Sequence, residues 1–304
     1  MAALADSRSH VALRVMPVVF VLIWSTGFIA ARFAMPNAPP FTFLCWRYGL
    51  SIACFGAWIF WARAPWPVGW AQWLHLVLTG VLMHAAYLGG VWAAVKAGIG
   101  AGTVALLVGL QPVLTAAWLS ALAAPNGACV VTVRQWAGLG LGLAGLTLVV
   151  WRKLGVGEVT PWNLSLAFVA LIGITAGTLY QKRFVTRCDV RTANTIQLSA
   201  ALLVSLPLAF GESEAMRWNL TSMAALLWSV IGLTLGGSSL LYLLIQRGAA
   251  TRVTSLLYLV PPTTALMAWA IFGEELTAPT LLGMLLTAVG VALVVTAPPA
   301  RLSR

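Results

Sequence analysis

Ten apolar stretches occupy almost all of this 304-residue chain. An α-helix rises about 1.5 Å per residue, so about 20 apolar residues cross the ~30 Å hydrocarbon core of a bilayer. The composition agrees, because 61% of the residues are hydrophobic and only 8% are charged. A soluble domain of this length needs a polar surface that the chain cannot supply. The sequence therefore predicts an all-α integral membrane protein with ten transmembrane helices.

Turn-forming residues separate the stretches. Pro36 and Pro65 end the first two spans, Pro125 with Gly127 ends the fourth, and Pro279 opens the tenth. The connections are only a few residues long, so no soluble domain is expected between the spans. The predicted spans are 15–34, 41–61, 71–94, 100–122, 134–151, 162–184, 192–210, 220–246, 250–272 and 279–296.

The distribution of basic residues predicts the orientation. With a cytoplasmic N-terminus, twelve basic residues lie at cytoplasmic ends: Arg8, Arg14, Arg63, Arg134, Lys182, Arg183, Arg187, Arg191, Arg247, Arg252, Arg301 and Arg304. Five then lie at outer ends: Arg32, Lys96, Arg152, Lys153 and Arg217. Cytoplasmic loops favour Lys and Arg, so we expect a multi-pass membrane protein with both termini cytoplasmic. The net charge of +11 is spread over short loops, where it suits anionic lipid rather than nucleic acid.

The chain also contains an internal repeat. Each half, residues 15–151 and 162–296, holds five predicted helices, and an odd number makes the second half enter the membrane from the opposite side. Inverted five-helix repeats are a recurring architecture of secondary transporters, with substrate bound near the midplane. A duplicated bundle without a transport role is the alternative. The pairs aligned at an offset of 150 or 145 include Gly98 with Gly248, Pro112 with Pro262, Gly138 with Gly283, and Gly145 with Gly290.

Several motifs resemble those of a known family. They are Trp24-Ser25-Thr26-Gly27-Phe28, Pro40 followed by Arg47-Tyr48, Leu259-Val260-Pro261-Pro262, Phe272-Gly273-Glu274-Glu275-Leu276-Thr277, and Gly283 with Gly290. Over residues 15–296 the chain resembles the drug/metabolite transporter superfamily, EamA type, and most of all its bacterial aromatic-amino-acid exporters. The resemblance implies export of metabolites such as amino acids from the cytoplasm, across the bacterial inner membrane. The first half departs from the pattern, because Ala124-Pro125-Asn126 stands where the second half has Gly273-Glu274-Glu275.

Polar residues inside the spans are the candidates for substrate binding, because burying them in hydrocarbon is costly. In span three, Gly80, His84, Tyr87 and Val91 follow a helical spacing and share one face. For each aromatic residue, packing or an interfacial belt is the alternative, and for His84 a bond to a neighbouring carbonyl. The expected substrate-binding residues are Trp24, Thr26, Met83, His84, Tyr87, Pro112, Tyr180, Gln181, Ser239, Tyr242 and Gln246.

Glycine and proline inside the spans suggest packing and bending. Gly138 and Gly142 form a small-xxx-small pair that favours a helix-packing or dimer face over a substrate wall. Pro112 and Pro261-Pro262 remove intrahelical hydrogen bonds, which makes either a static kink or a hinge.

Arg47 lies six residues into span two, roughly 9 Å from its outer end. It could snorkel to the interface, pair with Glu274 or Glu275, or bind a substrate carboxylate. Snorkelling or structural pairing is the favoured interpretation.

No carboxylate lies at mid-membrane, because all seven acidic residues fall in loops or at helix ends. A pump for organic cations needs a buried anion, so the chain suits neutral or zwitterionic substrates with apolar bodies. His84 is the mid-span group that titrates near neutrality, which leaves both proton coupling and downhill efflux open. The cysteines lack metal-binding spacing, and neither a metal nor a cofactor is expected.

The sequence thus predicts a secondary transporter that exports aromatic and other apolar amino acids by alternating access, as a monomer or homodimer. It is not expected to be an enzyme. A passive facilitator or channel is one rival. An intramembrane serine hydrolase is another, with Ser238 or Ser239 as nucleophile and His84 as base, although the chain lacks the Gly-x-Ser-x-Gly elbow.

Overall fold

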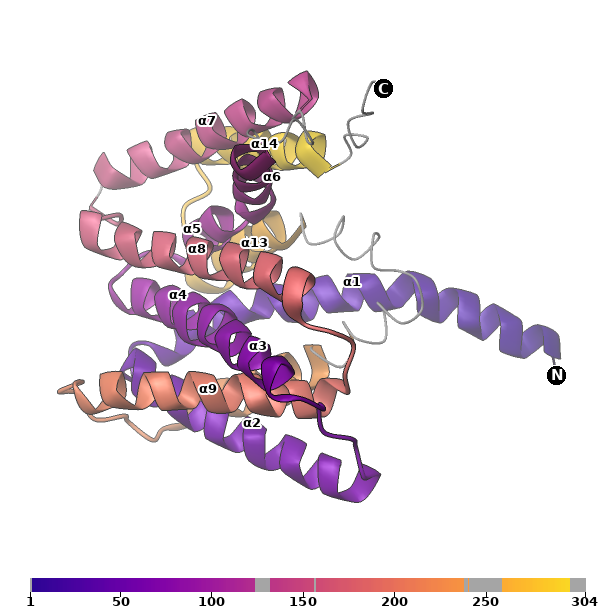
Figure 1. Cartoon of the computed structure of the whole chain (residues 1–304). Coiled ribbons are helices and arrows are strands. Elements are labelled where there is room, and N and C mark those ends of the chain that lie inside the picture. The colour runs from indigo at the N-terminus through magenta and orange to yellow at the C-terminus, as the bar shows by residue number, and fades with distance from the viewer. Residues whose placement is uncertain (1, 124–131, 156, 238–239, 241–258, 296–304) are drawn as a thin grey trace.

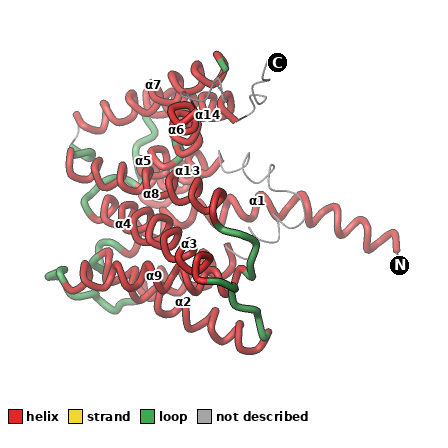
Figure 2. Tube along the Cα trace, in the orientation of Figure 1, coloured by secondary structure: helices red, strands yellow, loops and turns green. Residues whose placement is uncertain are grey.

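The computed structural model describes the chain except residues 1, 124–131, 156, 238–239, 241–258 and 296–304. All regular elements in the described residues are helices, and no strand occurs among them (Figure 2). The helices in the first half are α1 (Ala2–Ala34), α2 (Pro40–Ala62), α3 (Trp70–Gly80), η1 (Val81–Ala86), α4 (Tyr87–Lys96), α5 (Ala101–Val108), α6 (Gln111–Ala123) and α7 (Val133–Gly155). Those in the second half are α8 (Pro161–Phe184), α9 (Val190–Phe210), α10 (Leu220–Leu227), η3 (Trp228–Gly237), α13 (Val260–Phe272) and α14 (Ala278–Val295).

These elements form the ten expected crossings. Three of the crossings consist of more than one element: α3–η1–α4, α5–α6 and α10–η3. Seven helical stretches are long and apolar enough to cross a membrane, and shorter apolar helices cover Val18–Ala34, Val260–Phe272 and Ala278–Val294. The chain is therefore a ten-helix membrane protein. The end of the eighth expected span and the start of the ninth lie outside the described residues.

Local chemistry explains where the helices begin. Thr160 caps α8 through a capping box with Asn163, and Pro161 takes the first helical position, where its missing N–H costs nothing. Asp189 caps α9 by accepting from the Arg191 backbone N–H. A hydrogen bond from the Arg191 side chain also holds the pKa of the Asp189 carboxyl below its ordinary value. The capping carboxylate thus stays charged at the positive end of the helix dipole.

The third span of each half widens into a π-helix. In the first half this segment is η1, and in the second it is η3, which begins 147 residues later (228 − 81). That distance falls between the two repeat offsets of 145 and 150. A π-segment breaks the regular ladder of backbone bonds and often marks a functional site. Its occurrence in both halves agrees with the repeat.

Prolines lie in the first turn of a helix in both equivalent spans. Helix α5 ends at Val108, and α6 begins at Gln111 with Pro112 in its first turn. Pro261 and Pro262 occupy the first turn of α13. The first-half break lies against the start of α13, since a Cβ on Gly109 would lie 2.5 Å from Pro261 Cγ.

Helix packing repeats when the two halves are exchanged. Helix α1 packs on α10 and η3, as α8 packs on α3, η1 and α4. Helix α1 also contacts α13, as α8 contacts α5 and α6. Three pairs join a helix to its own equivalent: α2 with α9, α5 with α13, and α7 with α14. In Figure 1, α7 and α14 form one end of the molecule and α2 with α9 the other.

The α7–α14 pair shows that the repeats are inverted. Gly138 faces the Gly290 carbonyl, and its repeat partner Gly283 faces the Gly145 carbonyl. This reciprocal contact requires antiparallel helices and a pseudo-twofold axis perpendicular to them, which is an axis in the membrane plane. The predicted small-residue face therefore packs two helices of one chain together. Without side chains between them the backbones approach closely, as in other membrane helix pairs.

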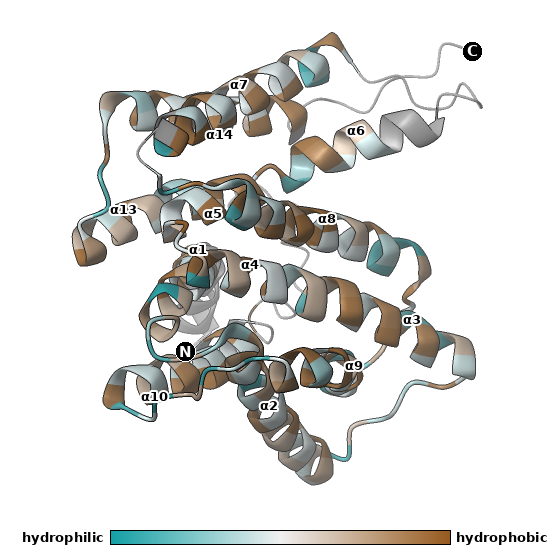
Figure 3. Ribbon diagram, turned by 90° about the vertical axis from the view of Figure 1, so that its left-hand side faces the viewer, coloured by the Kyte–Doolittle hydropathy of each residue, from teal (hydrophilic) through white to brown (hydrophobic). Residues whose placement is uncertain are grey.

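The outer surface of the bundle is apolar along the helices. Phe60, Trp61, Phe210 and Leu285 are among the exposed large side chains. Figure 3 shows hydrophilic (teal) segments mostly in the connections and at helix ends. A surface of this kind suits hydrocarbon around the helices and water at their ends.

Replacing Gly138 with Ala tests the α7–α14 contact. The new Cβ would lie 2.5 Å from the Gly290 oxygen, so the helices must separate. We expect a loss of about 1–3 kcal/mol of stability, the usual cost of overpacking. Gly140→Ala on the same helix is the control, because nothing lies within 4 Å of its Cβ position. Thermal unfolding in detergent, followed by tryptophan fluorescence, measures both; equal melting temperatures would contradict the packing argument.

Candidate functional site

A cluster of buried polar and aromatic residues lies between the two halves, around Arg47. Helix α2 supplies Arg47 and Tyr48, and the third span of the first half supplies His84, Tyr87 and Trp92. Counted from the helix ends at the same face of the bundle, Arg47 lies 7 residues after the start of α2 (47 − 40), and His84 of η1 lies 12 residues before the end of α4 (96 − 84). These depths are about 10–18 Å, near the middle of a ~30 Å hydrocarbon core.

Arg47 is the charged centre of the cluster and is only 6% exposed. Its Nε and Nη2 both donate to the Thr234 hydroxyl of η3, at 3.2 Å each. Its guanidinium carbon lies 5.9 Å from the centroid of the Trp92 ring, over its face. Trp92 is held in turn by stacking on Phe43, with 4.6 Å between ring centroids. The cation thus touches both halves of the protein.

The π-segment η1 carries His84 into this cluster. The Tyr48 hydroxyl donates to the backbone carbonyl of His84 at 2.9 Å, and the two rings meet edge to face. The His84 side chain lies close to the Gln197 side chain of α9. Helices of both halves therefore meet at this histidine.

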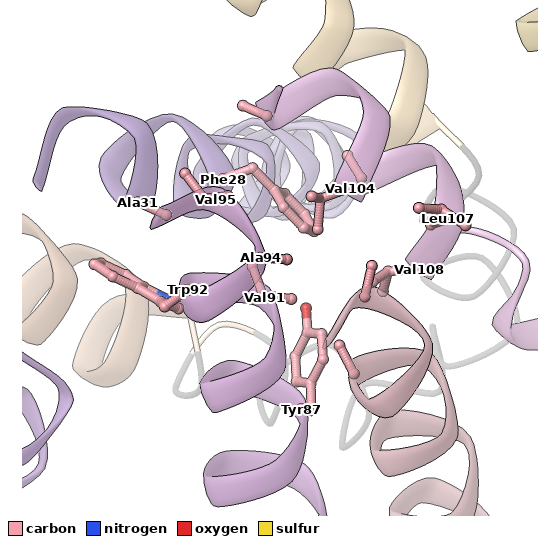
Figure 4. Close-up of a cluster of buried hydrophobic side chains, with 14 of the residues drawn as sticks. Phe28, Ala31, Tyr87, Val91, Trp92, Ala94, Val95, Val104, Leu107 and Val108 are labelled. Atoms are coloured by element: carbon pink, nitrogen blue, oxygen red, sulfur yellow. The ribbon is translucent and has the colours of Figure 1, made fainter. Parts of the chain in front are cut away.

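Helices α1 and α4 add Trp24 and Tyr87 to the cluster. The Trp24 indole lies close to the Tyr87 hydroxyl, so α1 meets α4 here. Tyr87 lies close enough to Arg47 for the two to interact electrostatically. Figure 4 shows the Tyr87 ring pointing along α4 toward Val91, while Trp92 leaves the same helix on another side.

The favoured expectation for Arg47 was wrong about its partners. Glu274 bonds the start of α5, Glu275 is exposed, and Arg47 is buried rather than snorkelling. An unpaired cation at a helix centre costs about 2.5–3.5 kcal/mol on membrane-insertion scales. One signal in the sequence could have identified it: of the 18 basic residues, Arg47 is the one that the orientation count places at neither membrane face. Thr234, Gln197 and Trp92 carried no such signal.

The structure does not place Tyr180 with Trp24, His84 and Tyr87. The Tyr180 hydroxyl lies 2.8 Å from His75 Nδ1, and its ring packs on Phe184. His75 precedes His84 by nine residues (84 − 75), roughly 13 Å along the same span. The expected substrate-binding residues are therefore divided between two clusters.

The other candidates occupy varied surroundings. Met83 packs where a Cβ on Gly177 would fall, Pro112 begins α6, and Gln181 is half-buried near the end of α8. Thr26 accepts from the Trp228 indole at 2.8 Å and borders a cavity of about 440 Å³ between α1 and α10. Ser239, Tyr242 and Gln246 lie outside the described residues, as does Ser238. Among the residues that the structure does describe, no cluster could hold a metal ion.

One end of the bundle, here called the acidic face, gathers Glu158, Glu212, Glu214, Glu274 and Glu275. Here acids of the second half bind helix N-termini of the first. Glu212 accepts from the backbone N–H groups of Phe41 and Thr42 at 2.8 Å each, and Glu274 accepts from Ala101 N–H at 2.9 Å. Helix N-termini offer unpaired donors and a positive dipole end, so each carboxylate fits its site.

Further polar contacts cross between the halves at the acidic face. Lys96 pairs with Glu214, and Asn219 donates to the Asn37 side chain at 2.8 Å. At the equivalent position on the opposite face the acceptor is uncharged. Thr42 donates to the carboxylate of Glu212, whereas its repeat partner Thr192 donates to the Pro65 carbonyl. The repeat is symmetric in packing but not in charge.

The inverted repeats and the buried polar cluster between them define a class of protein, the secondary transporters. This chain belongs to the EamA-like transporter family, whose model matches residues 15–151 and again 161–296. The family is one of transporters, not of enzymes. Membership also supports the expected multi-pass membrane location.

Relatives cover nearly the whole chain. An uncharacterized transporter of Archaeoglobus fulgidus is 25% identical over 297 residues, covering 94% of this chain and 96% of that protein. A probable amino-acid metabolite efflux pump of Escherichia coli K12 is 23% identical over 287 residues, covering 91% and 92%. A solved crystal structure matches with a TM-score of 0.61 at 18% identity, over 93% of this chain and 96% of that chain, which supports the fold.

Replacing Glu274 with Gln tests the contacts at the acidic face. The amide lacks the charge that favours the α5 N-terminus and keeps one acceptor oxygen, so we expect a loss of about 1–2 kcal/mol in stability. Glu275→Gln is the matched control, because that neighbour is exposed; a change within about 0.5 kcal/mol is expected there. Thermal unfolding of both variants in detergent provides the comparison. Destabilisation by Glu275→Gln alone would contradict the role given to Glu274.

Proposed function

We propose that this transporter exports amino acids from the cytoplasm by alternating access, with a preference for aromatic and large apolar side chains. The observation that carries the proposal is the mid-membrane cluster, in which polar groups of both halves meet the rings of Trp24, Tyr87 and Trp92. Aromatic rings hold an aromatic ligand by offset stacking, worth about 0.5–1.5 kcal/mol beyond burial.

The charges of the chain favour an amino acid over an organic cation. The seven acidic residues all lie in loops or at helix ends, and the charged group in the buried cluster is a guanidinium. A cationic drug there would meet a cation of like charge without a compensating anion. A zwitterion brings both charges with it. The name of the Escherichia coli relative, a probable amino-acid metabolite efflux pump, points the same way.

Alternating access requires the two halves to part at one face while they close at the other. The contacts of Glu212, Glu214 and Glu274 with the first half would hold the acidic face closed, and their rupture would open it. If the basic loops are cytoplasmic, this face is the outer one, and its opening is the release step. A passive channel that stays open at both faces would not need contacts that close the acidic face.

Transport into proteoliposomes tests the proposal. Counterflow of labelled phenylalanine and tryptophan is expected, and flux of a quaternary ammonium compound is not. Trp24→Ala should raise the KM for both amino acids roughly three- to tenfold, because the stacking surface of the ring is lost. Trp61→Ala is the control, since this ring is 83% exposed on the helix surface. Robust flux of the cation without amino-acid flux would overturn the proposal.

A further inference from the structure

The charge of Arg47 is not matched by a carboxylate in the described part of the chain. A guanidinium has five N–H donors. Among the described residues, its hydrogen bonds are the two that converge on the Thr234 hydroxyl, so three of its donors have no acceptor there. A hydroxyl and a ring face carry no formal charge, so they orient the cation without neutralising it. A cation buried to this degree ordinarily has a partner.

The protein's own carboxylates are occupied elsewhere. Glu212 and Glu274 bind the starts of α2 and α5, and Glu158 binds Gly100 N–H and Lys153. The other acids also lie away from the cluster: Glu214 with Lys96, Asp189 with Arg191, Glu275 exposed at the acidic face, and Asp6 near the start of α1. No carboxylate forms an ion pair with Arg47 in the part of the chain that the structure describes. The anion that complements this site must therefore come from outside.

The position of Arg47 suits a ligand anchor better than a structural strut. It is placed by residues of both halves, Trp92 from the first and Thr234 from the second, so domain motion changes its surroundings. Its planar fork presents parallel N–H groups that match the two oxygens of a carboxylate. A strut that only joined α2 to η3 would need one neutral donor and would not require a charge.

We propose that Arg47 binds the carboxylate of the transported molecule, and that this group rather than the ammonium is what the site requires. The inference rests on the proposed function and sharpens its substrate class. Substrates are carboxylates with an aromatic or large apolar body, amino acids among them. A deaminated analogue, 3-phenylpropionate, should bind as well. An amine without a carboxylate, 2-phenylethylamine, should not.

Binding to the purified full-length protein in detergent tests this directly, through ligand-induced thermal shifts at neutral pH. Phenylalanine and 3-phenylpropionate are expected to stabilise the wild type at concentrations roughly tenfold or more below any effect of 2-phenylethylamine. Arg47→Gln should abolish the preference for the carboxylates. Arg47→Lys, which keeps the charge but loses the fork, should retain it in part. Arg183→Gln, an exposed arginine at the end of α8, should leave binding unchanged.

The outcomes separate this inference from the proposed function. Equal binding of 2-phenylethylamine and 3-phenylpropionate to the wild type overturns the role of Arg47, even when amino acids are transported. A carboxylate preference that survives in Arg47→Gln overturns it as well. Arg47-dependent binding of carboxylates, together with no amino-acid flux in proteoliposomes, supports the anchor and refutes amino-acid export. If Arg47→Gln does not fold, the wild-type ligand series and Arg47→Lys still decide the question.

Discussion

Hydrocarbon offers no hydrogen bonds, and this constraint governs the rest of the structure. Each backbone N–H and C=O within the membrane must find a partner inside the protein, which is why the described chain is built of helices. Exposed side chains such as Trp61 and Leu285 can then be apolar without aggregation. Association of the helices cannot rely on the hydrophobic effect, because lipid tails are equally apolar. It relies on close packing, which the glycines of α7 and α14 permit.

The same constraint explains the side-chain contacts of the two π-helical segments, η1 and η3. A π-helix loosens the backbone ladder at a place where water cannot compensate, so neighbouring side chains must provide the partners. The Tyr48 hydroxyl does so at the His84 carbonyl, and the Thr234 hydroxyl does so at the Ser229 carbonyl. Both segments border the Arg47 cluster. Backbone irregularity and the candidate site therefore coincide in both halves.

The two repeats share a packing scheme but differ in charge. Glu212 and Glu274 act on helix N-termini of the first half at the acidic face, where the helix dipoles are positive. The repeat partner of Thr42 meets only a carbonyl on the opposite face. The two faces are therefore held by different groups, carboxylates on helix N-termini at one and a backbone carbonyl at the equivalent position of the other. The missing glutamate in the first-half signature motif fits this asymmetry.

The number of crossings, their boundaries and their inverted arrangement follow from the sequence by itself. They depend on local apolar length, on turn residues such as Pro36 and on an odd helix count per repeat, all of which are readable along the chain. The cluster does not follow from the sequence, because it joins residues far apart along the chain. Periodicity identified His84 and Tyr87 as sharing a face, but it could not divide Tyr180 from them or bring Thr234 to Arg47. Only tertiary packing decides which helix a buried charge contacts. A mid-membrane arginine is not solvated by water, so it binds the group that the fold places beside it.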